Sequence, residues 1–328
     1  MAFTAPAAAQ TDRLDAPHLV GRLAGGDRFE TSVAVSKAGH PGGAKVAYIT
    51  SALGFADALS TAPAAVSRDG SLLLTQPWGI PAAVSAELTR LHPDRIVIVG
   101  GTAAVGPTVE RALTEFTGAV ERVSGADRFA TSRALADTFT GPVDTVYLAS
   151  GFDYPDALSA GAAAGAKGGP VMLIDPRSGA LDAATKAVIR KLQPTSIAVV
   201  GGTAAIPEST VTQAKTLVTT VVRLGGSDRF ETSAKVADTL PAGTTGYIAS
   251  GLNFPDALVG SVIAGATKRP LYITQPTSLT CPIWYSMLDG GITDLTAIGG
   301  TRSLTDTATN PGCDALPPTD FSDFQSSN

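Results

Sequence analysis

The hydrophobic positions in the middle third of the chain form two kinds of segment: short continuous runs and longer runs with helical spacing. The continuous apolar or β-branched runs lie at residues 145–149, 171–174 and 197–200. Such runs predict strands that are buried on both faces of a parallel sheet. The segments with the length and spacing of helices lie at residues 128–138, 155–166, 181–192 and 207–218. Strands that alternate with such helices predict βαβ units with right-handed crossovers.

The same pattern occurs three times, because three sequence blocks recur in one order. The first block, Arg-Leu/Val-x-Gly-x-Asp-Arg-Phe-x-Thr-Ser, begins at Arg22, Arg122 and Arg223, a period of about 100 residues. The second block, Phe/Tyr-Ala/Pro-Asp-Ala-Leu, begins at residues 55, 154 and 254. The third block, a strand followed by Gly-Gly-Thr, ends at residues 102, 203 and 301. A repeat of this length predicts consecutive copies of one structural unit.

We therefore predict an α/β protein of three tandem three-layer α/β modules with mostly parallel sheets. A unit of about 100 residues is large enough to bury its own core. The third copy is predicted to be incomplete, because a proline-rich segment stands where its closing helix would be. The predicted divisions are an N-terminal segment (1–19), repeat 1 (20–120), repeat 2 (121–221), repeat 3 (222–312) and a C-terminal tail (313–328).

The composition is that of a globular protein with few charges: 44% of the residues are hydrophobic and 16% are charged. The net charge of −5 argues against a nucleic-acid partner, because nucleic-acid binders normally have a basic excess. No apolar run approaches the ~20 residues that a membrane span requires. The start of the chain, rich in small residues and ending Ala-Ala-Ala-Gln at Gln10, resembles the end of a secretory signal. We therefore expect a secreted protein; an ordinary frayed terminus is the alternative interpretation of this segment.

Two cysteines, Cys281 and Cys313, lie in the last fifth of the chain. In a secreted protein an even pair predicts a disulfide, which here would stabilise the fold by roughly 3 kcal/mol in the chain-entropy model. Two buried free thiols are the alternative.

The three blocks together resemble the cell wall-binding type 2 repeats of Gram-positive surface proteins. The resemblance covers essentially residues 20–305. It implies three modules around a pseudo-threefold axis, as in surface-layer (S-layer) proteins, autolysins and autolysin modifiers. It also implies that the modules hold the protein to an anionic wall polysaccharide or teichoic acid without a covalent bond. Such proteins usually carry an additional effector domain, and the repeats account for most of these 328 residues.

Three sets of recurring residues are candidates for binding such a polymer. The arginines of Asp-Arg-Phe have a planar guanidinium that suits phosphate or carboxylate oxygens. The aspartates of the second block follow a strand end, where open parallel sheets bind ligands, and the Gly-Gly-Thr turns let an anion approach backbone N–H groups. The candidates are Arg28, Arg128, Arg229, Asp57, Asp156, Asp256, Gly101, Thr102, Gly202, Thr203, Gly300 and Thr301.

Each set also has a purely structural interpretation. The arginine could pair with a nearby carboxylate, the second aspartate could cap a helix, and the glycines could simply form a tight turn. For the first block, Asp127 or Ser124 is expected to cap the helix that begins at residue 128.

Residues for catalysis or metal binding are few. His18, His40 and His92 fall in or near the first copy and form no pair with zinc-ligand spacing. Two aspartates per copy could suggest glycosidase chemistry, but their separation of 28–30 residues along the chain fixes no distance between them. No Ser/His/Asp set is available in copies two and three, which contain no histidine. We therefore predict no enzyme activity, no metal and no cofactor.

The favoured function is attachment to the cell surface through an anionic, teichoic-acid-like polymer, with three weak sites acting together. Two alternatives stay open: a secreted surface protein whose repeats bind another protein, and a cell-wall hydrolase or its modifier.

Overall fold

Each repeat folds around four short strands whose apolar residues are largely buried. The structure is a computed structural model that describes residues 16–54 and 57–312. In chain order the strands are β1 (His18–Leu23), β2 (Val46–Ser51), β3 (Ser71–Thr75), β4 (Arg95–Val99), β5 (Val120–Val123), β6 (Thr145–Ser150), β7 (Val171–Ile174), β8 (Ser196–Val200), β9 (Thr220–Leu224), β10 (Thr245–Ser250), β11 (Leu271–Thr274) and β12 (Asp294–Ile298).

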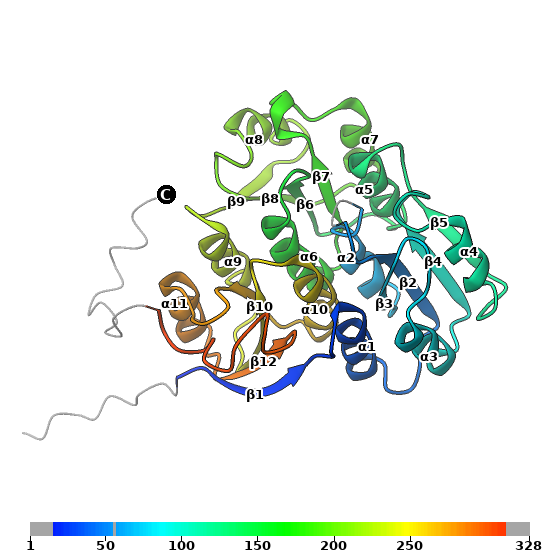
Figure 1. Ribbon diagram of the computed structural model, residues 1–328. Helices are drawn as coiled ribbons and strands as arrows, with labels where there is room; N and C mark the ends of the chain where they lie inside the picture. Colours follow the sequence, from blue (N-terminus) through cyan, green and yellow to red (C-terminus); the bar gives the residue numbers. More distant parts are fainter. Residues whose placement is uncertain (1–15, 55–56, 313–328) are drawn as a thin grey trace, which may run out of the picture.

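Helices of four kinds connect the strands and flank each sheet (Figure 1). An opening helix begins at the arginine of each Asp-Arg-Phe, a central helix follows the first strand of each repeat, and an outer helix follows the second. The opening helices are α1 (Arg28–Gly39), α5 (Arg128–Ala136) and α9 (Arg229–Ala237). The central helices are α2 (Thr61–Val66), α6 (Pro155–Lys167) and α10 (Phe254–Thr267). The outer helices are α3 (Ala82–Leu91), α7 (Ala183–Leu192) and α11 (Cys281–Asp289), and the closing helices of repeats 1 and 2 are α4 (Pro107–Leu113) and α8 (Glu208–Ala214).

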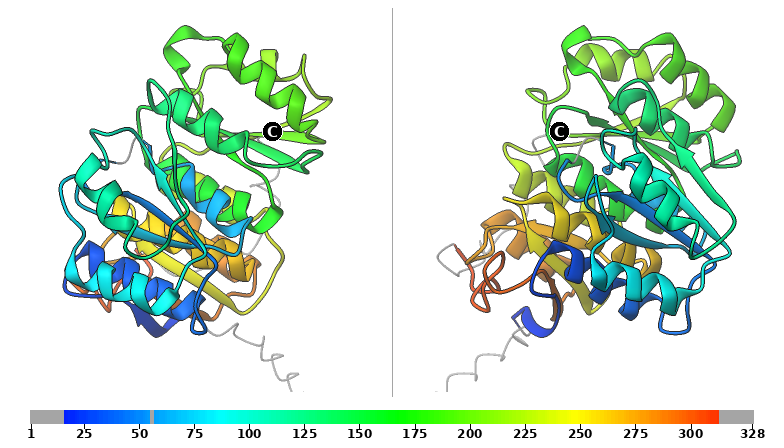
Figure 2. Two further views of the ribbon diagram at one scale, coloured as in Figure 1. Left: turned by 90° about the vertical axis from the view of Figure 1, so that its right-hand side faces the viewer. Right: turned by 45° about the vertical axis from the view of Figure 1, so that its right-hand side comes forward.

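The strands form three sheets in which every neighbouring pair is parallel. Their orders are β3-β2-β4-β5, β7-β6-β8-β9 and β11-β10-β12-β1. The three sheets surround the central helices, as Figures 1 and 2 show from three sides. The predicted class, three α/β modules with parallel sheets in a pseudo-threefold arrangement, is confirmed.

The first strand of the described chain completes the sheet of the last repeat. β1 pairs in parallel with β12 from His18 opposite Asp294 to Leu23 opposite Ile298, with an irregularity between Leu19 and Gly21. β5 and β9 have the same place in sheets one and two, and each runs directly into the opening helix of the next repeat. The predicted divisions follow the chain, whereas the sheets follow a closed ring in which the third repeat is joined to the first.

The three repeats share a core. A continuous cluster of buried apolar residues runs through all three, and a second, smaller cluster lies within repeat 3. The reason lies in the central helices α2, α6 and α10, which contact one another. α6 and α10 are buried on almost every side and consist largely of small residues, which lets helix backbones approach closely. Within the described residues, no helix is long and apolar enough to cross a membrane.

The predicted disulfide is not supported by the structure. Cys281, the first residue of α11, has a free thiol and is half-buried. Cys313 lies outside the described residues. Of the two interpretations, the free thiol is the one that Cys281 shows.

Candidate functional site

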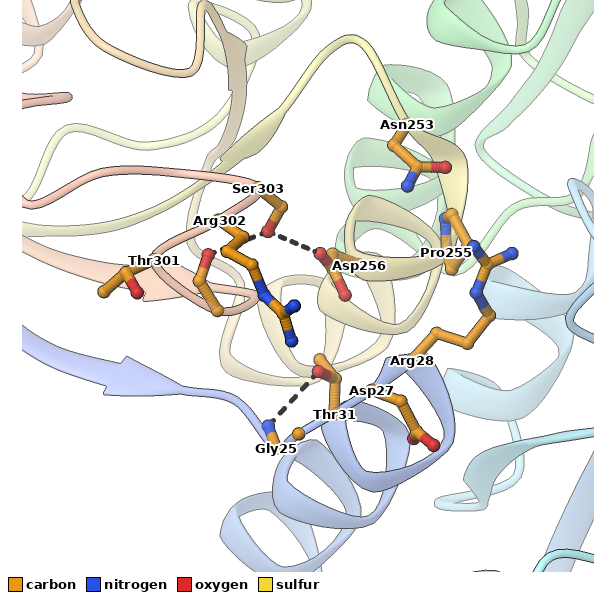
Figure 3. Close-up of a pocket in the computed structure, with 12 residues that line it drawn as sticks. Gly25, Asp27, Arg28, Thr31, Asn253, Pro255, Asp256, Thr301, Arg302 and Ser303 are labelled. Carbon is orange, nitrogen blue, oxygen red and sulfur yellow. Dashed lines mark hydrogen bonds between the residues drawn. The ribbon is translucent and has the colours of Figure 1, made fainter.

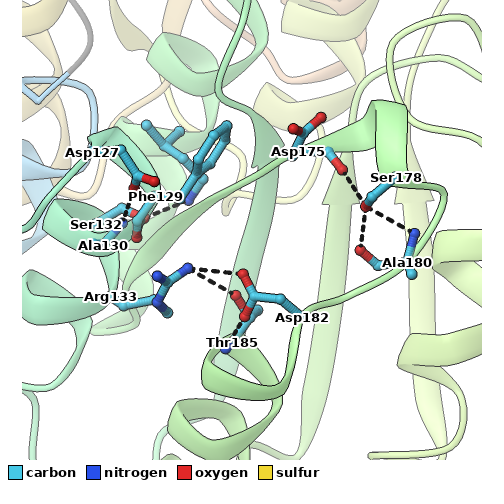
Figure 4. A network of polar contacts seen from close by, with 11 residues as sticks. Asp127, Phe129, Ala130, Ser132, Arg133, Asp175, Ser178, Ala180, Asp182 and Thr185 are labelled. Carbon is cyan, nitrogen blue, oxygen red and sulfur yellow. Dashed lines mark hydrogen bonds and ion pairs between the residues drawn. The ribbon is translucent and has the colours of Figure 1, made fainter.

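The aspartates of Asp-Arg-Phe fix the start of the opening helices. Asp27 accepts hydrogen bonds from the backbone N–H groups of Phe29 and Glu30 at 2.8 and 2.9 Å. Asp127 accepts one from Ala130 at 2.7 Å, as Figure 4 shows, and Asp228 has the same role in α9. The expected cap of α5 is therefore Asp127. A capping aspartate of this kind stabilises a helix by about 1 kcal/mol.

The arginines that follow these aspartates tie each opening helix to the end of the first strand of its own repeat. In each case Nη1 donates a hydrogen bond to the backbone carbonyl just beyond that strand. The pairs are Arg28 with Ala52 (2.8 Å), Arg128 with Gly151 (2.6 Å) and Arg229 with Gly251 (2.9 Å). The predicted alternative of a carboxylate partner is met at Arg229, whose Nη2 lies 4.0 Å from a carboxylate oxygen of Asp153. The guanidinium groups are half-buried at the carboxyl edge of the sheets.

A second arginine in the same block has a structural role that sequence reasoning missed. Arg22, Arg122 and Arg223 donate Nη1 to the carbonyl of the first glycine in a Gly-Gly-Thr turn, at 2.7, 2.6 and 2.8 Å. Each also pairs with a carboxylate, which is Glu110 for Arg122 and Glu208 for Arg223. The signal was available, because this arginine opens the block in all three copies. These bonds hold the turn against the strand that closes each sheet.

The second set of aspartates lies against those turns. The first glycine of each turn has a positive φ, 109° at Gly100, 123° at Gly201 and 106° at Gly299, which a residue with a side chain rarely adopts. A Cβ on Gly201 would come within 2.6 Å of an Asp156 carboxylate oxygen, and one on Gly100 within 3.0 Å of Asp57. The glycines therefore serve both the turn and the close approach of the carboxylate.

Burial changes the titration of two of these carboxylates, Asp156 and Asp256. It raises the pKa of Asp156 to about 6, with the negative charge of Asp153 acting in the same direction, while Thr232 and Arg229 oppose it. Burial also raises the pKa of Asp256, which is only 8% exposed; Ser303, Arg28 and Thr31 oppose that rise. The simple helix cap expected as the alternative is not what these residues do, since they lie within the first turn of α6 and α10.

The three sets of candidates meet where consecutive repeats meet. We name these places junction 1/2, junction 2/3 and junction 3/1, after the repeats that they join. Each combines the second aspartate and the Gly-Gly-Thr turn of one repeat with the opening helix of the next. The proximity of residues from both repeats is direct at junction 3/1, where Arg28 and Asp256 line one cavity, and at junction 2/3, where Arg229 and Thr232 act on Asp156.

Junction 3/1 contains a cavity lined by residues of both repeats (Figure 3). Its cavity has a volume of about 350 Å³. It is lined from repeat 1 by the segment around Asp27 and Arg28, and from repeat 3 by Asp256 and the turn that contains Gly300 and Thr301. Sequence reasoning missed Asn253, Arg302 and Ser303, which also line it, because they have no counterpart of the same type in the other copies.

The other two junctions combine the equivalent elements of their repeats. At junction 1/2, α5 contacts α2 and Asp57 lies against Gly100, whereas residues 55–56 lie outside the described part of the chain. The turn residues predicted to meet the ligand are accessible at both junctions: Gly101 and Gly202 are half-buried, and Thr102 and Thr203 are exposed.

Histidine, cysteine and carboxylate side chains do not gather into a metal site. Within residues 16–54 and 57–312, no three of them lie together as ligands would. The chemistry that the junctions offer is therefore that of guanidinium groups, backbone N–H groups and hydroxyls, which recognise oxyanions. The fold and its rim of such junctions define a tandem-repeat binding module.

Comparison with known proteins agrees with this class. The chain is 27% identical over 90% of its length to the N-acetylmuramoyl-L-alanine amidase LytC of Bacillus subtilis, covering 58% of that protein. It is 26% identical over 86% of its length to the amidase enhancer of the same species, covering 38% of it. Among solved structures it resembles Cwp6 from Clostridium difficile, with a TM-score of 0.83, 25% identity, 90% of this chain and 47% of that chain. Cwp8 from the same species gives a TM-score of 0.78 at 27% identity, covering 88% of this chain and 50% of that chain.

The family model "Cell wall binding domain 2 (CWB2)" matches residues 22–110, 122–211 and 223–309. The chain belongs to this family, and it is a cell wall-binding module of three repeats. It spans little more than half the length of the amidase and less of the enhancer.

Proposed function

We propose that the three junctions bind an anionic, teichoic-acid-like polymer of the Gram-positive cell wall and so hold the protein at the cell surface. The observation that carries this proposal is the recurrence of one set of groups at the joins between repeats: a half-buried guanidinium, a glycine turn and an exposed threonine. Arginine forks and free backbone N–H groups favour phosphate or carboxylate oxygens. A wall polymer presents such oxygens at regular intervals.

Three similar sites suit a polymer better than a single small ligand. Each site offers few donors, so each alone is expected to bind weakly. When one junction holds the polymer, the next unit is presented to the neighbouring junction at high effective concentration, and the overall affinity rises by ~10²–10⁴. The closed ring fixes the spacing of the junctions, which selects for polymers of matching repeat length.

The first test is co-sedimentation with purified Gram-positive cell walls. We expect the protein to sediment with intact walls and to stay in solution after the teichoic-acid-like polymer has been extracted. The triple variant Arg28→Gln, Arg128→Gln and Arg229→Gln is expected to lose most of this binding. Equal binding to extracted and intact walls would refute the proposal.

A control with the same loss of charge separates a local effect from a general one. Lys37, Arg190 and Lys215 are exposed at the ends of α1, α7 and α8, on the opposite edge of the sheets. The triple variant Lys37→Gln, Arg190→Gln and Lys215→Gln is expected to sediment as the wild type does. A similar loss in both triple variants would mean that net charge alone, without the junctions, accounts for binding.

The same proposal includes secretion, attachment as part of a surface or S-layer assembly, and no catalysis by the repeats themselves. The amidase and the enhancer are named for activities of longer proteins, and this chain spans only part of each. In support, the paired aspartates are employed as a helix cap and as a buried contact to a turn. Release of labelled fragments from cell walls by the purified chain would contradict the absence of catalysis.

A protein partner is the second candidate, because apolar side chains are exposed at one equivalent position in every repeat. Leu53, Phe152 and Leu252 follow the first strand of each repeat and are 53%, 38% and 56% exposed. If a wall protein is the partner, protease treatment of the walls should abolish sedimentation. The polymer proposal expects binding to survive that treatment.

A further inference from the structure

Junction 3/1 differs from the other two in the residues that follow its Gly-Gly-Thr turn. Arg302 and Ser303 stand there, whereas alanines occupy the equivalent positions at the other junctions, namely Ala103, Ala104, Ala204 and Ala205. One of the three junctions therefore has an additional cation and an additional hydroxyl. The Gly-Gly-Thr that precedes these positions is shared by all three junctions.

Arg302 and Arg28 reach the cavity of junction 3/1 from opposite walls. In Figure 3 the guanidinium of Arg302 points into the cavity between Thr31 and Asp256, and that of Arg28 lies on the far side beside Pro255. Arg302 forms no hydrogen bond or ion pair with any residue that the structure describes. Arg28 uses Nη1 for the carbonyl of Ala52, and its remaining N–H groups have no partner within that same part of the chain.

The carboxylates of the same cavity are, in contrast, already held. Asp27 accepts the two backbone hydrogen bonds that start α1. Asp256 is 8% exposed and accepts a hydrogen bond from Ser303 at 2.9 Å. Burial raises the pKa of Asp256. Two arginines of the cavity therefore keep N–H groups available for a ligand, whereas one oxygen of Asp27 and one of Asp256 are already engaged.

Junction 2/3 shows the contrast at the equivalent positions. There the acidic Asp153 lies 4.0 Å from Nη2 of Arg229, and its counterpart at junction 3/1 is the neutral Asn253. An incoming anion at junction 2/3 meets one arginine whose charge is partly neutralised by that acid. At junction 3/1 it meets two arginines and an amide.

We propose that the cavity of junction 3/1 is the principal anion subsite of the ring, in which Arg302 and Arg28 clamp one oxyanion of the wall polymer from two sides. This inference rests on the proposed function and adds that the three junctions are unequal. The cavity of junction 3/1 has a volume of about 350 Å³, near the lower end of the ~300–1,000 Å³ of ligand pockets. It therefore fits one charged unit of a polymer. The oxyanion is a phosphodiester or a uronate carboxylate, since a guanidinium accepts either.

The test is the affinity of the full chain for two short probes, an oligo(glycerol phosphate) and an oligogalacturonate of equal charge, measured by titration calorimetry at fixed salt. The variant Arg302→Ala introduces the residue that the other two junctions already have, so the fold is expected to tolerate it. Loss of a charge-assisted hydrogen bond should weaken probe binding about tenfold or more. A loss with one probe only identifies the polymer chemistry, and a loss with both identifies a general oxyanion site.

Two further variants complete the test. Arg190→Ala removes a cation from the opposite edge of the sheets and should leave probe affinity unchanged. Ala103→Arg adds the missing cation to junction 1/2 and should raise probe affinity. If Arg302→Ala binds both probes as the wild type does, the inequality is overturned while the proposed function stands. If the wild type binds neither walls nor probes, the proposed function fails and the inference fails with it.

Discussion

The central helix of repeat 1 is much shorter than its counterparts in repeats 2 and 3. α2 has 6 residues, whereas α6 has 13 and α10 has 14. Pro63 explains the difference, because the equivalent positions in α6 and α10 are Ala162 and Val262. A proline has no N–H to donate to the carbonyl four residues earlier and is tolerated only in the first turn of a helix. Helix α2 therefore begins at Thr61, and Asp57 lies outside it.

The same comparison explains the axis of the ring. Val66 in α2 is equivalent to Gly165 in α6 and Gly265 in α10, and the three positions are in contact. A Cβ on Gly165 would lie 3.1 Å from Cγ2 of Val66 and 3.3 Å from Cα of Gly265. Three equal side chains cannot occupy one point, so only one repeat supplies a side chain. Repeats that are alike at the rim must therefore differ where they meet at the centre.

The largest effect is expected from placing a second side chain on the axis. Gly165→Val would put a branched side chain where the Cβ alone is already in tight contact, and overpacking of this kind costs about 3 kcal/mol. We expect a clear fall in the urea midpoint and in the Tm. The gain in helix propensity on replacing a glycine, about 1 kcal/mol or less, is too small to offset it.

A double variant provides the control. Val66→Gly combined with Gly165→Val moves the single side chain from α2 to α6 and should recover most of the stability lost in Gly165→Val. If the effects of the two substitutions on stability are simply additive, the side chains at these positions do not compete for the same space. The explanation of the axis by a single side chain is then wrong.

The sequence alone predicts the repeat, the strands and the position of the second aspartates and the Gly-Gly-Thr turns after strand ends, because these follow from local patterns that recur three times. It does not predict that β1 pairs with β12, because that pairing joins residues more than 270 positions apart and its local pattern is the same as that of any edge strand. It also does not predict the importance of Arg302, which occurs in one copy and is absent from the shared motif. The role of Arg22 could have been found, since it recurs in step with the turn that it holds.

The second effect concerns the carboxylates, because Asp156 lies in the first turn of the longer helix α6. Its pKa is raised from 3.8 to about 6 by burial. A carboxyl group whose pKa is raised in the folded state stabilises the fold fully below about pH 4. This stabilisation is lost as the pH rises through about 6. Asp156→Asn removes this loss, so the variant should be more stable than the wild type by about 2 kcal/mol at pH 7.5 and nearly equal at pH 4.

The measurement is a series of thermal melts of both proteins between pH 4 and pH 8. The variant Asp153→Asn provides a second check, because the negative charge of the exposed Asp153 helps to raise the pKa of Asp156. In that variant the pH at which the wild-type stability is lost should move down. A constant difference in Tm between Asp156→Asn and the wild type at every pH would show that the substitution acts through packing and that Asp156 is not the titrating group.

The smallest effect tests the polar atoms that the short helix buries. The hydroxyls of Ser60 and Thr61 are buried and have no hydrogen-bond partner among the described residues. The positions equivalent to Thr61 in the longer helices are Ala160 and Gly260, which have no hydroxyl. Thr61→Val keeps the shape and removes an unsatisfied hydroxyl, so we expect a gain of about 1 kcal/mol in the free energy of unfolding. Thr232→Val is the matched control, because the Thr232 hydroxyl accepts a hydrogen bond from Gly226 at 3.1 Å and its loss should destabilise. If both variants lower the Tm, the Thr61 hydroxyl forms a stabilising hydrogen bond in solution, and the expected gain from removing it is refuted.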